Sequence, residues 1–142
     1  MTEKQTILCV DDDLDDLHLL QKAIHTTGPG FDIIEAYNGV EAIEHLERMK
    51  QEGNLPALIV LDINMPKMDG RETLLSIKND NQLAEIPVVI LSTSSSILDR
   101  IFFHKKNIEY ITKPIHFDTL LAIAGKLLSF VKRSNKDRKS VV

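Results

Sequence analysis

The chain has 142 residues, of which 43% are apolar and 27% charged, and its formal net charge is −4. This length suits one domain with a single sizeable core. Because five basic residues lie in the segment 132–139, the rest of the chain is more acidic than the net charge indicates. This acidity argues against general nucleic-acid binding. No apolar run approaches the roughly 18 residues that a membrane span needs, and Cys9 is the only cysteine. We therefore expect a cytoplasmic protein without membrane contact, in which Cys9 is a buried core residue.

Five short apolar runs predict five β-strands: TILCV (6–10), FDIIEA (31–36), ALIVL (57–61), PVVIL (87–91) and IEYIT (108–112). Each is followed by a helix-like segment, as with Leu17, Leu20 and Ile24 after the first run and Val40, Ile43 and Leu46 after the second. The third and fourth runs do not alternate, which is typical of strands buried on both faces of a parallel sheet. The pattern predicts an α/β protein with a doubly wound (βα)5 three-layer sandwich.

Polar side chains follow four of these runs. Asp11, Asp12 and Asp13 follow the first, Asp62 the third, Ser92 the fourth and Lys113 the fifth. In doubly wound sheets, ligands bind beyond the carboxyl ends of the strands. We therefore expect acids, a hydroxyl and an ammonium to meet at one edge of the sheet.

The stretch ILCVDDDLDD, residues 7–16, places five carboxylates within six positions. Two carboxylates ~4 Å apart repel by about 4 kcal/mol at an effective dielectric of about 20, so their convergence needs a cation or solvent. Asp11, Asp12 and Asp62 have the composition of a hard-cation site, and Mg²⁺ suits it. Asp13, Asp15 and Asp16 are expected at a helix start, facing the positive end of the dipole. Taken alone, the cluster is equally consistent with a solvated acidic helix start.

Lys113 and Ser92 are ordinary turn residues when each is considered alone. At a strand end, however, a fixed ammonium can pair with Asp62 or with a phosphoryl group attached to it, and a serine hydroxyl can donate to an anion. The residues leave open whether the Lys113–Pro114 peptide bond is cis or trans. The five histidines show no spacing typical of a metal site.

Together these residues resemble the receiver domain of two-component response regulators. The resemblance spans roughly residues 4–131 and includes, in order, ILCVDDD, LIVLDINMPKMDG, IPVVILSTS and YITKP. The segment DGRETLLSIKND with IPVVILSTS is also similar to stand-alone cyanobacterial phytochrome response regulators. The resemblance implies a flavodoxin-like strand order 2-1-3-4-5, with residues 1–131 forming the receiver domain and 132–142 a basic, disordered tail.

The resemblance also implies roles for the residues at the sheet edge. Asp62 would be the phosphoacceptor, receiving a phosphoryl group from a histidine kinase or a histidine phosphotransfer protein. Asp12 would bind Mg²⁺ directly and Asp11 mainly through water, with the backbone carbonyl of Asn64 completing the protein ligands. Lys113 would contact the phosphoryl group.

Further residues would transmit and time the signal. Ser92 would turn to hydrogen-bond the phosphoryl group, and Tyr110 would be the aromatic switch residue. Asn64 and Ser94, two residues beyond the acceptor and the switch hydroxyl, would tune the phosphate lifetime. Two departures from the family pattern are Ser92, where Thr is commoner, and HKKN at residues 104–107, where the family has a small Gly-Ala turn.

The sequence thus predicts a single-domain response regulator, a non-enzymatic signalling protein that takes part in its own Mg²⁺-dependent phosphorylation and dephosphorylation. Its downstream partner is unknown, and the resemblance allows a homodimer through the fourth helix, last strand and last helix. One alternative is a phosphate-independent receiver-like interaction module. Another is a haloacid-dehalogenase-type phosphatase, which would require Asp where this chain has Asn64.

Overall fold

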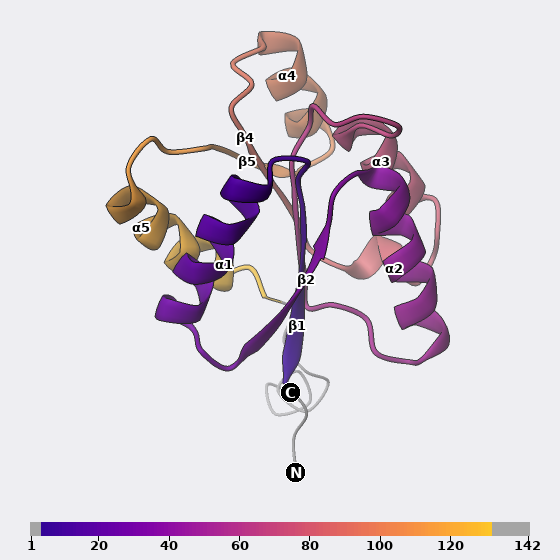
Figure 1. Cartoon of the computed structure of the whole chain (residues 1–142). Coiled ribbons are helices and arrows are strands. Elements are labelled where there is room, and N and C mark those ends of the chain that lie inside the picture. Colours follow the sequence, from indigo (N-terminus) through magenta and orange to yellow (C-terminus); the bar gives the residue numbers. More distant parts are fainter. Residues whose placement is uncertain (1–3, 132–142) are drawn as a thin grey trace, which may run out of the picture.

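The computed structural model describes residues 4–131, which form one five-stranded parallel sheet with helices on both faces (Figure 1). The elements in chain order are β1 (Gln5–Val10), α1 (Leu14–Thr27), β2 (Phe31–Ala36), α2 (Gly39–Gln51), β3 (Leu58–Leu61), α3 (Gly70–Lys78), the 3-10 helix η1 (Leu83–Glu85), β4 (Val88–Ser92), α4 (Ile97–Lys105), β5 (Glu109–Thr112) and α5 (Phe117–Leu128). The strand order is β2-β1-β3-β4-β5, with every neighbouring pair parallel. The predicted fold and strand order are confirmed.

Each face of the sheet has its own apolar core. In Figure 1, α1 and α5 lie on one side of the sheet, and α2 and α3 lie on the other. Side chains of β1 alternate between the two cores, because Ile7 and Cys9 pack with α1 and α5, whereas Leu8 and Val10 pack on the opposite face. Phe103 of α4 is fully buried in this second core. Burial on both faces explains why the central strands are apolar without alternation.

The helices bury the faces that their spacing predicts, with one exception. Leu17, Leu20 and Ile24 of α1 are buried as expected. In α2, Leu46 is buried and Ile43 packs against the core, but Val40, which the spacing grouped with them, is 38% exposed. The physical reason is helical phase, because the buried stripe of this helix consists of Gly39, Ala42, Leu46 and Met49.

The HKKN departure closes α4 without a glycine. Asn107 has φ 59°, a left-handed conformation that Asn tolerates better than most residues. The N–H of Asn107 donates to the carbonyl of His104 (3.0 Å), and the N–H of Ile108 donates to that of Phe103 (3.0 Å). This pattern is the Schellman motif, which ends the helix and directs the chain into β5.

Two further expectations concern Cys9 and the membrane. Cys9 is buried, and burial together with the charges of Glu35 and Asp11 raises the pKa of its thiol, which agrees with a core role. Among residues 4–131, no helix has the length and apolar character required to cross a membrane.

Candidate functional site

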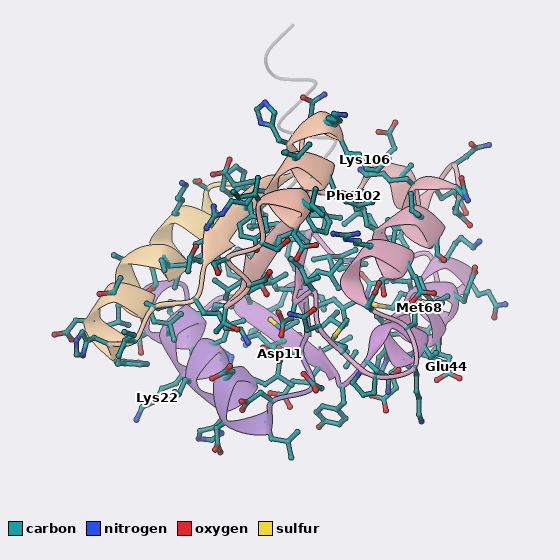
Figure 2. All side chains as sticks on the ribbon, turned by 90° about the horizontal axis from the view of Figure 1, so that it is seen from above. Asp11, Lys22, Glu44, Met68, Phe102 and Lys106 are labelled. Carbon is teal, nitrogen blue, oxygen red and sulfur yellow. The ribbon has the colours of Figure 1, made fainter. Side chains whose placement is uncertain are left out.

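The predicted acids meet where β1 and β3 end. These strands are neighbours in the sheet, and the N–H of Asp62 donates to the carbonyl of Val10 (2.9 Å). Asp11 and Asp62 are buried, whereas Asp12 is exposed. One carboxylate oxygen from each of the three lies within 4.8 Å of the other two. Figure 2 looks down on this edge, and Asp11 lies near the middle of the view between the helices of the two faces.

The backbone after β3 holds Asp62 in place. The N–H of Ile63 donates to Asp62 Oδ1 (2.8 Å), and the N–H of Gly70 donates to the carbonyl of Ile63 (2.7 Å). A Cβ at Gly70 would lie 2.3 Å from the carbonyl oxygen of Asp62, so only glycine lets α3 begin this close to the acceptor. Asn64 lies exposed in the same loop.

Lys113 reaches the acids from the end of β5. Its Nζ lies 2.6 Å from Asp11 Oδ2, 2.7 Å from Asp16 Oδ2 and 3.3 Å from Asp62 Oδ2. Its backbone N–H donates to the carbonyl of Ser92 (2.9 Å), and the Lys113–Pro114 bond is trans. Burial disfavours the ammonium, but hydrogen bonds to Asp11 and Asp16 outweigh it and hold the pKa of Lys113 above its ordinary value.

Burial is also the largest influence on Asp11. It raises the pKa of Asp11 to about 7, and the charge of Asp62 acts in the same direction, whereas Lys113 and the N–H of Asp13 oppose it. A divalent cation would favour the ionised form of such a carboxyl group. The cluster of Asp11, Asp12 and Asp62 offers only hard oxygen ligands, so its chemistry fits Mg²⁺ or a similar ion.

The switch candidates form a hydrogen-bonded chain beside this cluster. Ser92 is 1% exposed and its Oγ accepts from the N–H of Ser94 (3.2 Å), while the hydroxyl of Tyr110 donates to the carbonyl of Ser94 (2.7 Å). The hydroxyl of Ser94 donates to Asp99 Oδ2 (2.8 Å), and Asp99 forms an ion pair with Arg71. The side chain of Ser94 is thus hydrogen-bonded to α4.

The sequence analysis did not identify two residues of the site: Asp16, which contacts Lys113, and Asp99, which accepts from Ser94. Asp16 lies in the first turn of α1, as expected from the dipole argument, and its backbone N–H donates to the N-cap Asp13 (3.1 Å). The available signal was its position four residues before Leu20, on the buried stripe of the helix. No comparable signal pairs Asp99 with Arg71, which is 28 residues away in the chain.

This geometry can be compared with known proteins. A model of the response regulator receiver domain matches residues 7–124. The chain belongs to the response regulator receiver domain family. The resemblance inferred from the sequence motifs is therefore confirmed.

Rcp1 and RcpA are similar to this chain over most of their length. Response regulator Rcp1 of Synechocystis is 34% identical over 129 residues, which cover 89% of this chain and 88% of Rcp1. The phosphorylated cyanobacterial phytochrome response regulator RcpA is 34% identical with a TM-score of 0.81, over 89% of this chain and 93% of that structure. The Mn²⁺-bound form of Rcp1 is 33% identical with a TM-score of 0.75, over the same shares.

Family membership places this receiver domain in two-component signalling, in which receiver domains are phosphorylated by histidine kinases and bind a divalent metal ion. The acidic cluster agrees with such a metal site. The comparisons favour neither the phosphate-independent module nor the phosphatase.

Proposed function

We propose that this receiver domain is a phosphorylation-controlled switch whose acceptor is Asp62, with a histidine kinase or histidine phosphotransfer protein as the donor. The observation that carries the proposal is the placement of Asp62, buried at the point where the strand order reverses, with carboxylate oxygens of Asp11 and Asp12 within 4.8 Å and the ammonium of Lys113 3.3 Å away. This arrangement combines a nucleophilic carboxylate with the charges that phosphoryl transfer requires.

In the proposed reaction, a carboxylate oxygen of Asp62 attacks the phosphorus, and the bond from phosphorus to the donor's imidazole nitrogen breaks. The N–H of Ile63 holds Asp62 Oδ1, and Lys113 faces Oδ2, which supports Oδ2 as the attacking oxygen. Lys113 would then pair with the phosphoryl oxygens. Mg²⁺, held by Asp12, Asp62 and the carbonyl of Asn64, with Asp11 bound through water, would neutralise charge on the acceptor and the phosphoryl group.

The charge of the phosphoryl group would change the conformation of residues beside the acceptor. The hydroxyl of Ser92 would turn to the phosphoryl group, and this would release its contact with the N–H of Ser94. Because the hydroxyl of Tyr110 is hydrogen-bonded to the carbonyl of Ser94, the same movement would alter the position of Tyr110. We propose Asn64 and Ser94 as the residues that tune the phosphate lifetime.

The proposed output surface is the α4-β5-α5 face. Ile97, Leu98 and Ile101 of α4 are 72%, 72% and 45% exposed, an apolar group suited to a downstream protein or to a second copy of this chain. We assign the receiver domain to residues 1–131 and treat the basic segment 132–142, which lies outside the described residues, as a separate tail.

The test is the intact mass after incubation with acetyl phosphate and Mg²⁺. We expect the wild type to gain one phosphoryl group only when Mg²⁺ is present, and Asp62→Asn to gain none. Failure to gain a phosphoryl group from both acetyl phosphate and a phosphohistidine donor would favour the phosphate-independent module. Continuous release of phosphate from many small phosphoesters would instead favour the phosphatase.

A further inference from the structure

Lys113 has one carboxylate partner that belongs to neither the acceptor nor the acidic cluster. Of its three partners, Asp11 and Asp62 are members of the three-carboxylate cluster, but Asp16 is not. The Lys113 Nζ nevertheless lies closer to Asp16 (2.7 Å) than to Asp62 (3.3 Å). The ammonium that the phosphoryl group needs is therefore already shared with a carboxylate on another element.

The fold places Asp16 beside Lys113 by the way α1 starts. Asp13 caps the helix and accepts from the backbone N–H of Asp16, which fixes the first turn. The side chain then borders a small cavity, about 50 Å³, between α1 and the chain leading into α5.

Burial differs between the two partners of this ion pair. The side chain of Lys113 is 10% exposed and that of Asp16 is 37% exposed. Asp16 thus holds the ammonium from the solvent side, whereas Asp11 and Asp62, each 9% exposed, hold it from the sheet. An ion pair in this partly desolvated position is strong enough to affect which oxygen the ammonium contacts.

We propose that Asp16 is a positioning residue for phosphoryl transfer, which competes with Asp62 and its phosphoryl group for the ammonium of Lys113. This inference rests on the proposed function, because the competition matters only if Asp62 accepts a phosphoryl group. The three N–H donors of the ammonium already face Asp11, Asp16 and Asp62, so a phosphoryl group that binds Lys113 competes with Asp16 for a donor. Asp16 therefore slows phosphorylation and weakens the hold of the site on phosphoryl-like anions.

The test compares Asp16→Asn with Asp15→Asn. Both variants remove one negative charge from the first turn of α1, but Asp15 is exposed and makes no ion pair with Lys113. We expect Asp16→Asn to be phosphorylated by acetyl phosphate about threefold faster than Asp15→Asn, an effect of the size that a partly exposed ion pair gives. Beryllofluoride with Mg²⁺, titrated calorimetrically as a phosphoryl mimic, should bind Asp16→Asn more tightly by a similar factor.

A second comparison separates competition for Lys113 from simple repulsion of the anionic donor. In a Lys113→Ala background, Asp16→Asn and Asp15→Asn should have equal beryllofluoride affinities, because no ammonium remains to be shared. If the threefold difference persisted there, Asp16 would act on the anion directly and the inference would be wrong. Equal behaviour of the two variants with Lys113 present would also overturn it.

These outcomes are distinct from failure of the proposed function. If the wild type gains no phosphoryl group from any donor, the proposed function fails. If the wild type is phosphorylated at Asp62 but Asp16→Asn behaves like Asp15→Asn, only the role of Asp16 fails.

Discussion

The carboxylates of Asp11, Asp12 and Asp62 repel one another in the folded chain, at the site that we propose binds Mg²⁺. Their oxygens lie within 4.8 Å of each other, and two of the three side chains are buried. Lys113 offsets part of the repulsion through its contacts with Asp11 and Asp62. A residue that serves the site can therefore destabilise the protein when no cation is bound.

Asp12→Asn should expose this conflict. In the presence of a chelator, we expect the variant to have a free energy of unfolding about 1 kcal/mol higher than the wild type, because one exposed negative charge leaves the cluster. Added Mg²⁺ should stabilise the wild type much more than the variant. Urea unfolding in chelator and in Mg²⁺ measures both effects. Asp32→Asn, exposed on β2, is the matched control, and lower stability of Asp12→Asn in chelator would contradict the prediction.

At the scale of elements, α3 and α4 are joined beside the switch residues. Arg71 of α3 forms an ion pair with Asp99 of α4, and its guanidinium lies 5.2 Å from the ring centroid of Phe102. Figure 2 places Phe102 on the side of α4 that faces α3. Since Asp99 also accepts from Ser94, this contact ties the loop after β4 to both helices.

Arg71→Ala should loosen α4. We expect a loss of about 1–2 kcal/mol in stability, because the buried carboxylate of Asp99 loses its charged partner. Hydrogen exchange should accelerate in α4 and in the loop before it more than in α1. The control is Lys105→Ala, which removes an exposed charge from α4. Unchanged exchange in α4 would refute the proposed link.

A second connection joins α2 to the turn after α3. Lys50 Nζ lies 2.6 Å from Asp80 Oδ2, and Asp80 Oδ1 accepts from the N–H groups of Gln82 and Leu83. The hydrogen bond from Lys50, followed by that from Leu83, lowers the pKa of Asp80. Asn at position 80 can keep the Oδ1 contacts but loses the ion pair.

The pH dependence of Asp80→Asn follows from this lowered pKa. Because the folded pKa lies below the unfolded value, the carboxylate adds stability above about pH 4, and this contribution is lost as the pH falls through the folded pKa. The melting temperature of the variant should therefore be lower than that of the wild type at pH 7, and the difference should narrow below pH ~4. Melting curves across this range test it, with Asp32→Asn as the control for a lost charge. A gap that widened in acid would have the wrong sign.

At the scale of the whole molecule, the described residues 4–131 supply two apolar cores, one on each face of the sheet. Their side chains come from positions between Ile7 and Val131, on all five strands and on α1 to α5. The family match also ends within α5, at residue 124. The receiver fold and its site therefore lie within the described part of the chain.

Truncation after Val131 should leave this unit intact. We expect its stability to lie within about 0.5 kcal/mol of the full chain and its phosphorylation by acetyl phosphate to be unchanged, because every core side chain of the described residues is retained. Thermal melting and intact mass measure the two quantities. A clear fall in either would assign a role in folding or phosphorylation to residues 132–142.

The sequence by itself determined the order of strands and helices and the identity of the residues at the sheet edge. Apolar runs on both sides of each helical segment define parallel strands, and parallel strands bring the residues after them to a common edge. Asp11, Asp62, Ser92 and Lys113 could therefore be placed together without coordinates. These motifs were sufficient to identify the family, because each lies directly after a predicted strand and so at the same edge of the sheet.

Only the tertiary structure decided which partners these residues choose. Lys113 contacts Asp16, which lies 97 residues earlier in the chain, and the hydroxyl of Ser94 donates a hydrogen bond to Asp99 of α4. Such choices depend on rotamers and on how helices dock against the sheet, which hydrophobic periodicity does not specify. A long ammonium side chain among several carboxylates can be satisfied in more than one way, and packing selects the pairing.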